Sequence, residues 1–174
     1  MELVFPTIEH KQAVLDYRQE WLDSALGEGI NGSWGLQRAE YSNYEKWLSD
    51  LAKLATGGGN NPNISVPATT YLALCDNRIV GNIQIRHTLN DYLLHTYGHI
   101  GYSVRPSERR KGYATKMLAL ALEKCRDLGI ENVLISCDKN NIASRKTILK
   151  NGGAFTSEFT EDDGNTVQQY WITI

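Results

Sequence analysis

The sequence contains little cysteine and no long apolar run. Its three cysteines, Cys75, Cys125 and Cys137, are odd in number and lack CxxC spacing, which argues against a disulfide framework and a zinc site. We expect small buried thiols. No window approaches the roughly 18 uninterrupted apolar residues of a membrane helix, and the charged start MELVFPTIEHKQ is unlike a secretory signal. These absences favour a cytoplasmic protein with no membrane partner and no metal.

An excess of charge of one sign is also missing. Lys and Arg number 18 against 20 for Asp and Glu, so the formal net charge is −2. Nothing in the chain as a whole therefore attracts nucleic acid or an anionic membrane. With 174 residues, of which 41% are hydrophobic, the chain is expected to fold as one domain over residues 1–174.

Hydrophobic periodicity predicts both helices and strands. Helical spacing extends over residues 9–26, 42–55, 112–128 and 142–151. A breaker-rich loop at 56–63 follows the second of these ranges. Extended patterns cover residues 3–5, 70–74, 79–86, 99–104 and 132–137, and two more strands flank the acidic turn 161–164. The crossover between residues 99 and 137 implies a central parallel pair. The predicted fold class is α/β (α+β), with a mixed, mostly antiparallel sheet of about seven strands and about four helices.

The segment SERRKGYAT, residues 107–115, places three cations immediately before a glycine and a helix start. Unpaired N–H groups and the helix dipole make such a start an anion site, and Gly112 admits close approach of a phosphate. Arg109, Arg110 and Lys111 would add charge around it. Two alternatives stay open, a solvated basic turn and a nucleic-acid patch, although the net charge weakens the second.

Two motifs carry a family resemblance. Arg109-x-x-Gly112-x-Ala114 resembles the pyrophosphate-binding motif, Gln/Arg-x-x-Gly-x-Gly/Ala, of the GNAT superfamily of acyl-CoA-dependent N-acetyltransferases. Asn141-Ile142-Ala143-Ser144, followed by Lys150-Asn151-Gly152, resembles the family's later helix and its ending. The element order matches from about residue 2 to 174, and the chain is similar to a bacterial group of predicted acetyltransferases without an assigned substrate.

The resemblance implies a GNAT-like sheet in which acetyl-CoA lies between splayed strands at 99–104 and 133–138. The pantetheine arm would pair with strand backbone, backbone amides from 110 to 115 would hold the pyrophosphate, and the later helix would contribute from the opposite side. The cofactor-binding residues implied in this way are Tyr102, Ser103, Val104, Arg109, Arg110, Lys111, Gly112, Tyr113, Ala114, Thr115, Asn141 and Ser144.

The reaction implied by the resemblance is direct attack of a neutral primary amine on the thioester, without a covalent acyl-enzyme. His99 is the candidate general base, because its ordinary pKa of about 6.5 suits proton transfer near neutrality. The alternative is a structural histidine bonded to a neighbouring loop. A backbone N–H of the strand at 102–104 would suffice to stabilise the oxyanion.

The general acid is harder to assign. Many relatives carry a tyrosine seven residues beyond the cofactor-binding asparagine, but this position is Ile148 here. Tyr102, Ser103, Ser144 or a water could serve, and a thiolate with a pKa of about 8.5 could leave without help.

The expected acceptor is an amine on a small molecule or on a peptide. A competing hypothesis keeps the fold and the acyl-CoA site without catalysis, as a regulatory binding module, because the usual tyrosine is missing. The C-terminal strands, which end in QQYWITI, could also pair with a second subunit to form a homodimer.

Overall fold

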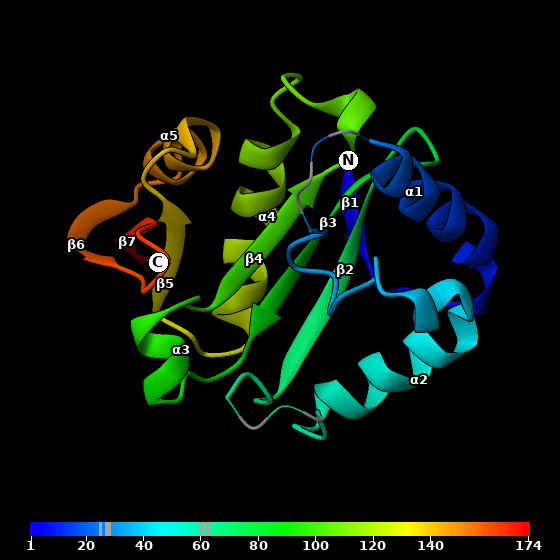
Figure 1. Cartoon of the computed structure of the whole chain (residues 1–174), viewed down its shortest axis with the longest axis horizontal. Coiled ribbons are helices and arrows are strands. Elements are labelled where there is room, and N and C mark those ends of the chain that lie inside the picture. Colours follow the sequence, from blue (N-terminus) through cyan, green and yellow to red (C-terminus); the bar gives the residue numbers. More distant parts are fainter. Residues whose placement is uncertain (25, 27–28, 60, 62) are drawn as a thin grey trace.

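The computed structural model describes residues 1–24, 26, 29–59, 61 and 63–174, and its strands form two sheets (Figure 1). The first contains, in spatial order, β1 (Glu2–Val4), β2 (Ala68–Cys75), β3 (Arg78–Arg86) and β4 (Ile100–Val104). The second has the order β5 (Asn132–Asp138), β7 (Thr166–Thr173) and β6 (Ala154–Thr160). Within the described ranges the α-helices are α1 (Lys11–Asp23), α2 (Tyr44–Ala55), α3 (Asp91–His95), α4 (Tyr113–Asp127) and α5 (Ile142–Lys150), with 3-10 turns η1 (Ile8–His10), η2 (Ala39–Ser42) and η3 (Pro106–Glu108).

The α+β class predicted from the sequence is confirmed, but the centre of the sheet differs from the expected one. All ladders between the described strands are antiparallel. β4 and β5 point the same way in Figure 1, yet they form no parallel ladder and belong to different sheets. An isolated bridge pairs Gly98 with Ile135. The strands approach there because Gly98 lacks a Cβ, which would lie 2.4 Å from the Leu134 carbonyl oxygen.

Several element boundaries also differ from the expected ones. The second long helix begins at Tyr44, and its cap is Asn43, whose side chain accepts from the Lys46 N–H at 3.0 Å. The expected loop after β3 contains the short helix α3. Ala25, near the predicted end of the first helix, and residues 60 and 62 of the breaker-rich loop lie outside the described residues.

Two apolar cores lie on opposite faces of the first sheet. On one face, α4 packs Met117 and Leu118 against Ile83 and Ile85 of β3. On the other face, α1 and α2 pack against Leu72 of β2 and its neighbours. Because side chains alternate along a strand, Asn82 and Gln84 of β3 and Ser103 of β4 lie on this second face, where they are buried.

The expected burial of the thiols is confirmed for Cys125 and Cys137, whereas Cys75 is half-buried. No helix in the described part of the chain is long and apolar enough to cross a membrane.

Candidate active site

The turn between β4 and α4 forms an open cradle at a helix N-terminus. Gly112 is the N-cap of α4 with a φ of 81°, and Arg110 has a φ of 64°, so the backbone turns through the left-handed region twice within three residues. A Cβ at Gly112 would meet nothing within 4 Å, so the space above this backbone is open. The first amides of α4 therefore border open space that suits a phosphate.

Two of the three cations of this turn contact residues away from the cradle. Lys111 Nζ lies 2.8 Å from Glu108 Oε2, and the Arg109 guanidinium lies over the Trp21 ring, 5.1 Å from its centroid. The Arg110 side chain is exposed. The backbone amides of the turn, more than its cationic side chains, are therefore placed to receive an anion.

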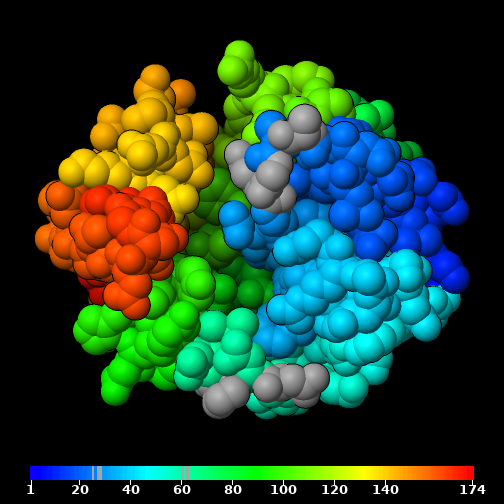
Figure 2. All heavy atoms as spheres, viewed as in Figure 1, coloured from blue at the N-terminus to red at the C-terminus, as the bar shows by residue number. Residues whose placement is uncertain are grey.

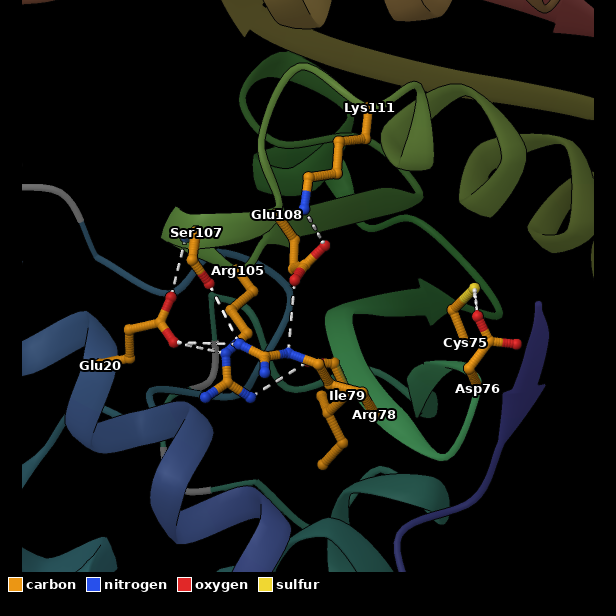
Figure 3. A network of polar contacts seen from close by, with 9 residues as sticks. All are labelled: Glu20, Cys75, Asp76, Arg78, Ile79, Arg105, Ser107, Glu108 and Lys111. Carbon is orange, nitrogen blue, oxygen red and sulfur yellow. Dashed lines mark hydrogen bonds and ion pairs between the residues drawn. The ribbon is translucent and has the colours of Figure 1, made fainter.

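A half-buried carboxylate holds the turn against α1 (Figure 3). Glu20 accepts from Arg105 Nε at 2.6 Å and from the Ser107 backbone N–H at 2.8 Å. Burial alone would raise the pKa of Glu20, but the bonds from Ser107 and Arg105 bring it below its usual range. Arg78 adds a second link, with Nε 3.3 Å from Glu108 Oε1. The cradle is thus supported by charges on α1 and β3.

The edge of β4 that faces β5 is free of strand pairing. His99 C=O accepts from Arg86 N–H at 2.8 Å, and Arg105 N–H donates to Val80 C=O at 2.8 Å. Within β4, Gly101 and Ser103 therefore direct their backbone groups toward β3. Successive backbone groups alternate in direction. Tyr102 and Val104 therefore direct theirs toward the open side, whereas Ser103, which we expected to share this role, directs its groups toward β3.

The opposite wall comes from the start of α5. Asn141 Oδ1 accepts from the Ser144 N–H at 3.0 Å, so its carbonyl is used in capping the helix. The Ser144 hydroxyl lies 2.7 Å from the Tyr102 hydroxyl and joins the two walls. Burial raises the pKa of Tyr102 to about 12. Ile148 is buried in the core, so it offers no polar group to the site.

His99 lies where the two walls meet. Its backbone N–H donates to the Leu134 carbonyl at 2.7 Å, and its Nδ1 accepts from the Leu134 N–H at 3.0 Å. Since Nδ1 is the acceptor, the proton of the neutral ring belongs on Nε2. Burial, assisted by the nearby charge of Arg86, lowers the pKa of His99 to about 4. The ring therefore stays neutral and joins β4 to β5.

A groove runs between these walls. Figure 2 shows it between the C-terminal sheet with α5 and the N-terminal half of the chain, with a floor in the green of the region around β4. The open backbone edge and the phosphate cradle suit an acyl-CoA, whose pantetheine has amides and whose pyrophosphate is anionic. In the described part of the chain no group of three or more His, Cys, Asp or Glu could hold a metal ion.

Two supporting residues had not been identified from the sequence. Glu20 is one, and its only signal was an acidic residue on an amphipathic helix. Asn151 is the other: its Nδ2 donates to Thr115 C=O at 3.3 Å and to Thr147 C=O at 2.9 Å, which ties the end of α5 to the start of α4. Its place in the Lys150-Asn151-Gly152 segment was the available signal.

Solved structures share this architecture. RimL, a ribosomal L7/L12 alpha-N-protein acetyltransferase in complex with coenzyme A, has 20% identity and a TM-score of 0.67, over 99% of this chain and 93% of that one. A ribosomal-protein-alanine N-acetyltransferase from Brucella melitensis has 14% identity and a TM-score of 0.67, over 100% of both chains. The microcin C7 self-immunity acetyltransferase MccE, in complex with acetyl-CoA and AMP, has 14% identity and a TM-score of 0.66, over 99% and 91%.

No curated protein matches the sequence. The family model of the acetyltransferase (GNAT) domain matches residues 9–154. Since this match covers well over half of the chain, the protein belongs to the GNAT family of acetyltransferases.

Proposed function

We propose that this protein transfers the acetyl group of acetyl-CoA to a primary amine by direct attack in a ternary complex. The observation that carries the proposal is the free edge of β4, which leads directly into the glycine-capped N-terminus of α4. An acyl-CoA can add to such an edge as an extra strand while its pyrophosphate receives the helix amides.

The donor is held mainly by backbone. The free groups of Tyr102 and Val104 pair with the pantetheine arm, and the amides of Arg110 to Thr115 receive the pyrophosphate. The backbone groups of Ser103 are directed toward β3, so this residue contributes only through its hydroxyl. The hydroxyl lies on the face of β4 opposite to the Tyr102 side chain. Asn141 and Ser144 contact the donor from the α5 wall. When bound, acetyl-CoA supplies the thioester that is attacked.

Of the two roles considered for His99, the geometry supports the structural one. A general base needs a free lone pair, and the Nδ1 lone pair of His99 is occupied by the Leu134 N–H. The depressed pKa also makes the ring a poor proton acceptor near neutrality. We therefore assign His99 as a positioning residue, and the ammonium of the acceptor loses its first proton to water.

The Tyr102 hydroxyl is the proposed proton donor to the departing thiolate. Its raised pKa keeps it protonated at neutral pH, and its bond to Ser144 fixes it between the walls of the groove. Many relatives carry a tyrosine on α5 at the position of Ile148. The Tyr102 phenol reaches α5 from the opposite strand, which supports it as a substitute for that tyrosine. A Tyr102 backbone N–H on the free edge would stabilise the oxyanion.

The acceptor is an amine of a small molecule or a peptide, and the exposed edge strand β6 offers a surface for pairing with a second copy. An acceptor screen tests the function: purified protein, acetyl-CoA and a broad amine panel, with release of the CoA thiol and the mass of the product as readouts. We expect amine-dependent release of thiol. Tight CoA binding without turnover on any amine would instead support a regulatory binding module.

A further inference from the structure

Arg86, the last residue of β3, is a half-buried cation with few partners. Its Nη1 donates to the Gly98 carbonyl at 3.0 Å, and its guanidinium lies over the Tyr97 ring, 5.9 Å from the centroid. Ile85 faces α4, so Arg86 lies on the opposite face of the sheet together with Gln84. The side chain therefore lies on the face of the first sheet that is turned away from α4, beside the buried Gln84.

The other buried or nearly buried arginines are better compensated. Arg18 donates to the carbonyls of Leu36 at 2.9 Å and Arg38 at 3.1 Å, and Arg105 pairs with Glu20 at 2.6 Å. The Arg86 guanidinium has five N–H donors, yet the described residues place no carboxylate within ion-pair distance of it.

Desolvation without an anion is unfavourable for a cation. Burial lowers the pKa of Arg86 to about 10, and the nearby Tyr97 only partly offsets this effect. A cation that is largely removed from water without a counter-ion is disfavoured, so proteins commonly supply one. Since this chain does not supply one among its described residues, a ligand is the natural source of the missing anion.

Arg86 lies near the part of β4 where the acceptor amine would attack. Its backbone N–H donates to His99 C=O, and its neighbour on the same face, Gln84, is paired with Gly101 in the middle of β4. The positive charge of Arg86 also helps to lower the pKa of His99, after the larger effect of burial. An amine that attacks a thioester held along the free edge of β4 from this face would have Arg86 close to its other substituents.

We propose that the acceptor is a small amino-acid-like molecule whose carboxylate pairs with Arg86 while its amine attacks the thioester. This inference rests on the proposed acetyl transfer. The new N–C bond forms as the C–S bond breaks. The ammonium loses two protons overall: one goes to solvent, and the other is balanced by the proton that the thiolate takes up. The carboxylate takes no part in the bond changes and serves to orient the amine.

The test compares the common α-amino acids with their α-amides, which keep the amine and lose the charge. Charge-assisted hydrogen bonds contribute about 1.5 to 3 kcal/mol, so we expect kcat/KM to favour at least one acid over its amide by about 10- to 100-fold. Arg86→Met should abolish that preference and Arg86→Lys should keep part of it. Arg126→Met, an exposed arginine on α4, is the matched control and should change nothing.

Binding of the same pairs to CoA-saturated protein gives a readout that does not need turnover. Equal binding of acids and amides to the wild-type protein would overturn the inference, and this comparison holds even if Arg86→Met folds poorly. Arg86-dependent acetylation of an acidic peptide, with no activity on free amino acids, would also overturn it. Carboxylate-dependent binding without any acetylation would leave Arg86 as an anion site but reject the proposed acetyl transfer.

Discussion

The two walls of the groove are built differently. The β4 wall is paired with β3 along its length, and the turn that follows it is held by Glu20, Arg105 and Glu108 (Figure 3). The α5 wall is a helix of nine residues joined to the first wall by the Tyr102–Ser144 bond and by Asn151. It is backed by a three-stranded sheet whose edge strand β6 is almost entirely exposed.

This difference indicates which wall is preformed. Ion pairs and ladder hydrogen bonds fix the phosphate end before any donor binds, whereas few bonds must change for the α5 wall to move. Elements with fewer buried contacts open at lower free energy cost. We therefore expect the β4 wall to determine donor affinity and the α5 wall to adjust to the pantetheine arm.

The largest expected effect is on the cradle of the β4 wall. Gly112→Glu puts bulk and negative charge where a phosphate would lie and should weaken acetyl-CoA binding more than 100-fold, as measured by calorimetry. Lys111→Ala should weaken it only a few-fold, because Lys111 faces Glu108.

Gly164→Glu is the matched control for that substitution, since Gly164 also has a positive φ, of 87°, and open space at its Cβ, but lies in the β6–β7 turn. It should leave donor binding intact. If Lys111→Ala proved more damaging than Gly112→Glu, charge and not backbone would make the cradle.

The next effect concerns the bond between the walls. Tyr102→Phe removes the proposed proton donor and should lower kcat by about 10- to 100-fold with little change in the KM for acetyl-CoA. Ser144→Ala removes the same hydrogen bond but keeps the phenol, so it should lower kcat only a few-fold. Equal losses in steady-state kinetics for both variants would assign the effect to the bond and not to proton donation.

Glu20 tests the support of the β4 wall. Glu20→Gln should reduce the free energy of unfolding by about 1 to 3 kcal/mol at pH 7, measured by denaturant titration. Because the pKa of Glu20 is lowered in the folded protein, this difference is present above the ordinary glutamate pKa of about 4.3 and is lost as pH falls through the folded value.

Glu45→Gln provides the comparison on the surface, because Glu45 pairs with Lys11 where both side chains are about half exposed, at 52% and 47%. Its effect should be the smaller of the two. A Glu20→Gln protein as stable as the wild type at pH 7 would show that the turn is not held from α1.

The smallest expected effect is on pH dependence. His99 has its pKa lowered to about 4 by burial and Arg86, so kcat/KM should show no inflection from this residue between pH 5 and 8. His99→Gln should keep the shape of the pH–rate profile while lowering the melting temperature. The contribution of neutral His99 to stability is complete above about pH 6.5 and declines as pH falls toward 4. Loss of an inflection near neutrality in the variant would restore His99 as the base.

Much of the fold was predictable because its signals are local. The apolar stripe of α4, the glycine at its N-terminus and the extended runs of β2 to β5 follow from residues close together in the chain. The common direction of β4 and β5 and their splay agree with the expectation, but the single sheet was not correctly predicted, because the described strands form two sheets. A crossover rule determines strand direction, but it does not say whether two strands stay within hydrogen-bonding distance.

The candidate site divides in the same way. Gly112 and Asn141 could be identified from motifs because each caps a helix within a few residues of itself. The roles of Glu20 and Arg86 could not, since the first acts on Ser107 and the second contacts Gly98 by way of tertiary packing. His99 was recognised as a candidate, but its bond to Leu134 determines which nitrogen is free.

By itself, the sequence determined the helices other than α3, most strands and the backbone turn of the cradle, because these depend on periodicity and on the conformational freedom of Gly112. The tertiary structure alone decided the division of the strands into two sheets, the tautomer of His99 and the desolvation of Arg86. Each of these depends on the distance between groups far apart in the chain, and only packing of the two sheets sets that distance.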